Sequence, residues 1–159
     1  MIPLTSPLTT DLYELNMVQA YLDRGEDKEA VFEFFVRRLP ERRGFLLAAG
    51  LEDALDYLET IKFSDAEIAW LKGTGRFRAN LIDYLRDFRF TGDVHAIPEG
   101  TACFANEPLL RITATLPQAQ LVESRLINIL HFQTLIASKA ARMVPLLCFS
   151  LILFFFPSK

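Results

Sequence analysis

The sequence contains few of the residues that build covalent or metal-bound frameworks. It has two cysteines, Cys103 and Cys148, and two histidines, His95 and His131. The cysteines are widely separated and neither belongs to a paired-ligand motif, which excludes a disulfide scaffold and the common zinc modules. We therefore expect no metal site in this chain, and a reducing, cytoplasmic location.

A large excess of charge of one sign is also absent. Lysine and arginine number 17 and aspartate and glutamate 20, which gives a net charge of -3. Such a chain has no general attraction for nucleic acid or for an anionic membrane, so an anion site would have to be a local cluster. The 51% apolar and 23% charged composition is that of a folded protein with one domain.

Long hydrophobic runs are scarce, and the main exception lies at the end of the sequence. Residues 146–156 are apolar apart from Ser150. This run of about eleven residues is shorter than the roughly 18 to 20 that a membrane helix needs, and its position is wrong for a signal peptide. We expect no membrane contact, and we treat residues 1–143 as one domain and residues 144–159 as an apolar tail.

The clearest local pattern is the start of a helix at Asp11. Glu14 follows three residues later, which is the spacing of a capping box. Two apolar stripes continue at helical spacing, one formed by Leu15, Val18 and Leu22 and the other by Tyr13, Met17, Ala20 and Tyr21. Two stripes predict a helix that is buried on more than one side, and from composition alone Tyr13 is a core aromatic residue.

The rest of the sequence alternates short strands with helices. We expect strands at 30–36, 45–49, 94–97, 102–104 and 110–114. Three short helices are expected as well: one lined by Leu51, Leu55 and Leu58, one that begins at the capping box of Ser64 and Glu67, and one lined by Leu81, Leu85 and Phe88. A long, mostly buried helix should run from Pro117, at its first position, to about Met143. The first strand is rich in apolar and aromatic residues and predicts a buried strand. Pro98-Glu99-Gly100 and the segment from Gly73 to Arg76 predict turns. The fold class is α+β.

Several segments carry a resemblance to a known family. They are Thr9–Met17, Phe32–Pro40, Ala48–Glu52, Pro98–Gly100, Glu107–Leu110 and Phe132–Arg142. Together, from about Pro7 to Met143, they resemble the N-terminal part of nicotinate phosphoribosyltransferase. The resemblance implies the N-terminal α/β sandwich part of a type II phosphoribosyltransferase. The catalytic barrel is missing and the tail does not follow the family pattern, as a truncation or frameshift near residues 142–145 would produce.

The family resemblance also implies a reaction. The ring nitrogen of nicotinate attacks the anomeric carbon of phosphoribosyl pyrophosphate, which forms nicotinate mononucleotide in NAD salvage with coupled ATP hydrolysis. The complete enzyme is expected to be a cytoplasmic homodimer of the ligase class that uses Mg²⁺ and ATP, neither of which has a binding motif in this chain. We expect no catalytic residue here and no activity from the chain alone, because the catalytic sequence lies in the barrel.

Two alternatives to this function stay open. The chain is a noncatalytic fragment or subunit-interaction module, whose barrel-facing surface pairs or aggregates, or it is a fragment of a nicotinamide or quinolinate phosphoribosyltransferase. The apolar end of the chain favours self-association. The sequence of residues 10–17 favours nicotinate over nicotinamide or quinolinate as the substrate.

Tyr13 is the substrate-binding candidate. By resemblance it stacks on the pyridine ring at a site that two subunits share, and an aromatic face suits a flat aromatic acid. Asp11 is better explained as a helix cap, and Thr10 fits either role.

Arginines provide the phosphate-binding candidates. By resemblance Arg37 or Arg38, at the end of the first strand, reaches the phosphates of a neighbouring subunit's substrate, since guanidinium groups offer paired donors to phosphate oxygens. The sequence does not choose between the two. Arg42 and Arg43 are better explained as part of a solvated loop.

The remaining polar candidates have structural explanations. Lys139 and Arg142 lie near the expected end of a helix, where positive charge is favoured without any ligand. His131 is expected to be a hydrogen-bonded core histidine. Neither His131 nor His95 matches the histidine that the family phosphorylates.

Overall fold

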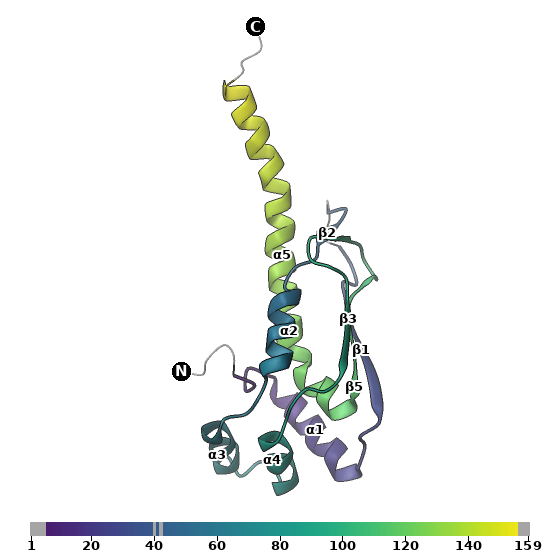
Figure 1. Ribbon diagram of the computed structural model, residues 1–159, viewed down its shortest axis with the longest axis vertical. Coiled ribbons are helices and arrows are strands. Elements are labelled where there is room, and N and C mark those ends of the chain that lie inside the picture. The colour runs from purple at the N-terminus through teal and green to yellow at the C-terminus, as the bar shows by residue number, and fades with distance from the viewer. Residues whose placement is uncertain (1–5, 40, 42, 156–159) are drawn as a thin grey trace.

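Residues 6–39, 41 and 43–155 are described by a computed structural model, with the backbone alone considered for 145–155 (Figure 1). In chain order the elements are α1 (Leu12–Arg24), β1 (Glu29–Phe35), β2 (Leu46–Leu47), α2 (Leu51–Thr60), α3 (Asp65–Gly73), α4 (Ala79–Arg86), β3 (Asp93–Ala96), β4 (Ala102–Cys103), β5 (Pro108–Thr115) and α5 (Leu116–Phe155). The expected mixture of helices and short strands is therefore confirmed.

The strands form two antiparallel sheets. The larger has the order β1-β5-β3, with Glu33 and His95 both opposite Arg111, and the smaller pairs β2 with β4. Because alternate side chains of a strand point to opposite faces, one face of the larger sheet is apolar and packs toward the helices while the other faces outward. Figure 1 shows this sheet beside the first part of α5.

The first part of α5 lies at the centre of the core. Leu121 and Val122 are fully buried, and they belong to a cluster that also includes Leu81, Leu85 and Ile112 from α4 and β5. Burying a leucine side chain contributes about 2 kcal/mol, so these layers account for much of the packing energy that holds α5 in place.

The start of α1 is as predicted, but its burial is not. Glu14 reaches back to the Asp11 amide and completes the capping box. Of the two apolar stripes, however, only the one with Leu15 and Val18 is buried, whereas Tyr13 is 46% exposed. The prediction of burial on more than one side is wrong, because the buried residues of α1 are Glu14, Leu15 and Val18, which share one face of the helix.

The prediction that β1 is a buried strand is also wrong. Its residues alternate between exposed and half-buried, because β1 lies at the edge of the sheet and the helices cover only one of its faces. In α2, Leu55 is exposed, and the buried face consists of Ala54, Tyr57 and Leu58. The spacing of apolar residues alone therefore overestimated the burial of β1 and of Leu55 in α2.

The long helix differs from its prediction at both ends. It begins at Leu116, so Pro117 is its second residue, and its backbone continues to Phe155 instead of ending near Met143. No glycine stop lies between these two positions, and Pro145 does not end the helix. His131, Ile136 and Ala140 are exposed, which contradicts the expected core histidine and the expected burial along this half. Among the residues that were searched, no helix has the length and hydropathy to cross a membrane.

The predicted turns and the second capping box are confirmed. The Ser64 hydroxyl and the Glu67 carboxylate cap α3 reciprocally, and residues 74–75 form the turn that follows it. In the turn at Pro98-Glu99-Gly100, Gly100 has a φ of 77°. The Glu99 carboxylate also accepts hydrogen bonds from the Gly50 and Leu51 amides at 2.6 and 2.7 Å, so this turn caps the start of α2.

Candidate functional site

The first turn of α1 presents Tyr13 at the surface. Its hydroxyl lies 3.4 Å from Glu123 Oε1 of α5, to which it donates a hydrogen bond. Partial burial and then the nearby Glu123 carboxylate raise the pKa of Tyr13, so the phenol is neutral at physiological pH. One face of an uncharged aromatic ring is thus available to a flat ligand or to a neighbouring subunit.

The neighbouring residue, Glu14, is a fully buried carboxylate. It accepts hydrogen bonds from the Ser124 amide at 2.9 Å and from the Asp11 amide at 3.2 Å, while the Ser124 hydroxyl donates to Asp11 at 3.2 Å. Burial raises the pKa of Glu14 to about 7 against the opposing effect of these hydrogen bonds. These bonds join the start of α1 to α5 and fix the backbone that carries Tyr13.

Further polar groups surround this contact between α1 and α5. Among the described residues, Tyr57 Oη, Arg125 Nε and Thr10 Oγ1 are buried without a hydrogen-bond partner. Burial raises the pKa of Tyr57, while the Arg125 charge opposes that rise. Thr10, which fitted two roles in the sequence, instead borders a separate hollow together with Leu12, Leu15 and Trp70.

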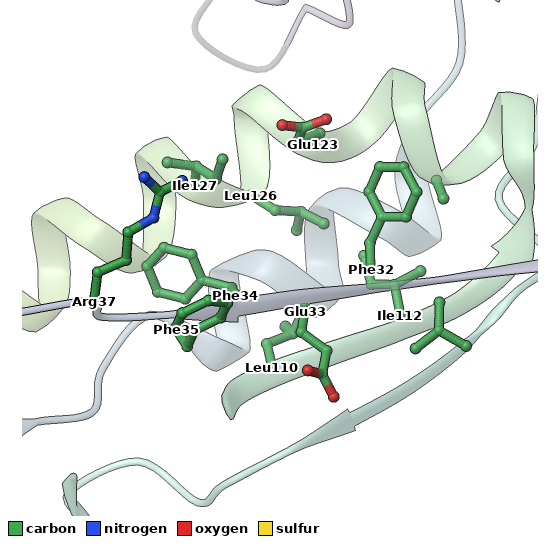
Figure 2. Close-up of a pocket in the computed structure, with 12 residues that line it drawn as sticks. Phe32, Glu33, Phe34, Phe35, Arg37, Leu110, Ile112, Glu123, Leu126 and Ile127 are labelled. Carbon is green, nitrogen blue, oxygen red and sulfur yellow. The ribbon is translucent and has the colours of Figure 1, made fainter. Parts of the chain in front are cut away.

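A groove of about 330 Å³ lies between β1 and α5 (Figure 2). Its apolar wall includes Phe32, Phe34, Leu110, Ile112, Leu126 and Ile127. Three charged residues, Glu33, Arg37 and Glu123, line it as well, and Figure 2 shows Arg37 extending from the end of β1 toward α5. Arg38 is exposed and is not part of the lining.

Glu123 is common to the two predicted binding elements. It lines the groove together with Arg37, and it accepts the hydrogen bond from Tyr13. Tyr13 thus contacts Glu123 directly, and Arg37 borders the same groove as Glu123, whereas Arg38 is not part of the lining. Sequence reasoning missed Glu123 and the burial of Glu14. The available signal for Glu123 was a carboxylate within a mostly apolar helix. For Glu14 the sequence showed a capping residue but not that its side chain is buried.

The other candidates are not gathered into a site. Lys139 and His95 are exposed, Arg43 is half-buried, and Arg42 lies outside the described residues. Among the residues that were searched, no group of three or more His, Cys, Asp or Glu side chains is arranged to hold a metal ion. The candidate site therefore consists of the Tyr13 surface, the end of β1 and the groove.

Comparison with known sequences assigns the chain to a family. Residues 8–131 match the model of the nicotinate phosphoribosyltransferase N-terminal domain. A nicotinate phosphoribosyltransferase of Mycobacterium tuberculosis (strain H37Rv) is 46% identical over 137 residues, which are 86% of this chain and 30% of that protein. The Bacillus subtilis enzyme of the same name is also 46% identical over 137 residues, which are 28% of its length. The chain thus spans less than a third of these relatives.

Comparison with solved structures agrees. The crystal structure of the human nicotinic acid phosphoribosyltransferase superposes with a TM-score of 0.77 and 32% identity, covering 95% of this chain and 29% of the human one. A nicotinate-nucleotide pyrophosphorylase from Pyrococcus furiosus, at 20% identity and a TM-score of 0.58, shares the fold. The predicted resemblance and the α+β fold are confirmed. The chain belongs to the nicotinate phosphoribosyltransferase family, of which it contains the N-terminal domain.

Proposed function

We propose that this chain is the nicotinate-contacting part of an enzyme that forms nicotinate mononucleotide from nicotinate and phosphoribosyl pyrophosphate, with coupled ATP hydrolysis, in NAD salvage. The proposal draws on the names of relatives that are 46% identical over most of the chain. The structural observation that carries it is the exposed Tyr13 ring, held on a helix start that buried hydrogen bonds join to α5.

Tyr13 is proposed to stack on the pyridine ring in a site completed by a second subunit of a homodimer. An exposed aromatic ring on a rigid helix start loses little freedom when a flat ligand packs against it. Its neutral hydroxyl, which donates to Glu123, leaves the face of the ring for stacking. Tyr13 thereby orients the base so that the ring nitrogen faces the anomeric carbon.

One of the two arginines at the end of β1, Arg37 or Arg38, is proposed to meet phosphate. Both Arg37 and Arg38 are exposed. Guanidinium groups near the departing pyrophosphate stabilise the negative charge that develops on it. The described residues contain no suitable metal ligand set. We therefore assign Mg²⁺ and ATP to the remaining part of the enzyme and derive no step through them. Cytoplasmic location belongs to the same proposal, and the buried free thiol of Cys103 agrees with it.

A chimera tests this function. Residues 7–143 of this chain replace the matched region of the Bacillus subtilis enzyme, and nicotinate mononucleotide formation is measured at varied nicotinate concentrations. We expect activity, a KM for nicotinate raised about tenfold by Tyr13→Ala, and a KM near the parent value for Tyr13→Phe, which keeps the ring. Tyr21→Ala, later on the same helix, is the matched control. A folded but inactive chimera, or equal effects at Tyr13 and Tyr21, would contradict the proposal.

A second candidate function, a noncatalytic interaction module, is favoured by the exposed apolar side chains of α5. Phe132, Ile136 and Met143 are each at least half exposed. Assay of the purified chain alone, with nicotinate, phosphoribosyl pyrophosphate, ATP and magnesium, separates the two candidates from a self-sufficient enzyme. We expect no turnover from either, and turnover would contradict both.

A further inference from the structure

A second hollow lies between the start of α1 and the end of α3, apart from the groove. Its lining includes Leu12 and Leu15 of α1 and Trp70 and Leu71 of α3, and its volume is about 410 Å³. None of the residues that line this α1–α3 hollow lines the groove, and Tyr13 is not among them. The volume falls within the range of about 300 to 1,000 Å³ that is typical of sites for small molecules. The hollow is therefore a candidate ligand site that the proposed function does not use.

Most of the lining is apolar. Leu15 and Leu71 are buried and belong to the main core, whereas Leu12 is 48% and Trp70 59% exposed. An indole ring that is more than half exposed at the border of an apolar hollow offers a flat surface on which another aromatic ring stacks. The part of a ligand that fits this wall is apolar and aromatic.

The charge in the lining has one sign. Among the described residues that border the α1–α3 hollow, Arg76 alone is charged, and no carboxylate is present. Arg76 is exposed and forms no ion pair with any described residue. Its guanidinium group offers paired donors to a carboxylate. The α1–α3 hollow therefore favours an anion, in contrast to the groove, which Glu33 and Glu123 also line.

The turn that carries Arg76 is fixed to the end of α3. The Thr74 hydroxyl donates to the Leu71 carbonyl at 2.7 Å and accepts a hydrogen bond from the Arg76 amide at 3.3 Å. The Gly75 amide donates to the Lys72 carbonyl at 3.1 Å. Because these bonds already hold the backbone, only side chains have to be ordered when a ligand binds, which lowers the cost of binding.

We propose that the α1–α3 hollow binds a small aromatic carboxylate, whose ring stacks on Trp70 and whose carboxylate pairs with Arg76. Thr10 borders the same hollow, and its buried Oγ1 has no partner. After rotation about χ1, this hydroxyl donates to the second carboxylate oxygen. The site goes beyond the proposed function, because Tyr13, Arg37 and Arg38 are not part of its lining.

The test follows Trp70 directly. It is the single tryptophan of the chain, so its indole N–H gives one assignable NMR signal. Naphthalene-2-carboxylate and its neutral analogue, naphthalene-2-carboxamide, are titrated separately into the full chain. We expect the acid to shift this signal saturably, with a Kd of about 1 mM or lower, and to bind at least about fivefold more tightly than the amide, because only the acid forms a charge-assisted pair.

Matched variants assign that preference to Arg76. Arg76→Gln should remove the preference for the acid and change the affinity for the amide less than about twofold. Lys72→Gln, at an exposed cation of α3 outside the lining, should retain the preference, and Tyr13→Ala should bind the acid as the parent does.

Four results would overturn the proposal. They are an acid that leaves the Trp70 signal unchanged, equal affinities for the acid and the amide, a preference that survives Arg76→Gln or is lost in Lys72→Gln, and loss of binding in Tyr13→Ala. The last result would place the acid at the surface proposed for nicotinate. Since no turnover is measured, these outcomes do not depend on whether the proposed function is correct.

Discussion

The first half of α5, residues 116–130, and the second half, residues 131–144, are both rich in apolar residues, but their large apolar side chains differ in exposure. Leu121 and Leu126 are at most 3% exposed, whereas Phe132 is 67% and Ile136 is 53% exposed. Besides α1, α2 and the larger sheet, α5 contacts β2. On that side the second half buries only Thr134 and Ser138, which accept hydrogen bonds from the Ala49 and Leu47 amides. Figure 1 shows the end of α5 extending beyond the other elements. An apolar pattern therefore reports what a helix is able to bury, while the neighbouring elements decide what it does bury.

The largest difference between the halves should be in stability. Leu121→Ala removes a fully buried side chain and leaves a cavity, which we expect to lower the free energy of unfolding by about 3 kcal/mol. Ile136→Ala, the matched change in the exposed half, should cost less than about 0.5 kcal/mol. Urea unfolding of both variants measures this. Equal losses would show that the exposed half is packed in solution.

The second prediction concerns the carboxylate buried between α1 and the packed half of α5. The pKa of Glu14 rises from 4.5 to about 7 on folding, so the folded state holds this proton more tightly than the unfolded chain. The stability that this proton contributes is present below pH 4.5 and is lost as the pH rises through 7, on the order of 3 kcal/mol.

Glu14→Gln isolates that effect. Glutamine is neutral throughout this range and can still accept a hydrogen bond from the Ser124 amide, so urea unfolding between pH 4.5 and 7.5 should change less for the variant than for the parent. The Glu123→Gln variant, with its side chain at the groove, is the control and should retain the fall. If the free energy of unfolding of the parent rises over this pH range, and does so only while Glu14 is present, the raised pKa of Glu14 is contradicted.

The sequence predicted the elements better than their depth. Helix starts at Asp11 and Ser64 were found correctly because a cap is a local hydrogen-bond pattern within four residues. The burial of β1 and of the second stripe of α1 was predicted wrongly, since it depends on which elements lie next to them. For the site, family resemblance pointed to Tyr13 and to the arginines, but Glu123 enters only through contacts between residues distant in sequence.

The third prediction tests how closely α2 approaches the packed half of α5. Gly50 has a φ of 100°, and an added Cβ would lie 3.2 Å from the Ile129 carbonyl oxygen and 3.3 Å from Gln133. Gly50→Ala should therefore cost both backbone strain and a steric shift, roughly 1 to 2 kcal/mol. Gly100→Ala is the control, since its φ is 77° with no atom within 4 Å of the added Cβ, and thermal unfolding should show a smaller loss. Similar losses would mean that α2 can move away from α5 at little cost.

The smallest effect on stability is expected in the exposed half of α5, where self-association of the chain is the more informative measurement. Phe132 is more than half exposed, so Phe132→Ser should change the free energy of unfolding by less than about 0.5 kcal/mol. Removing its ring reduces the apolar surface available to another molecule, and sedimentation velocity at increasing concentration should show less self-association than for the parent. Lys139→Ser, on an exposed polar position of the same half, is the control. If Phe132→Ser unfolds the chain while leaving association unchanged, this half of α5 is packed within its own domain, and the contrast between the two halves does not hold in solution.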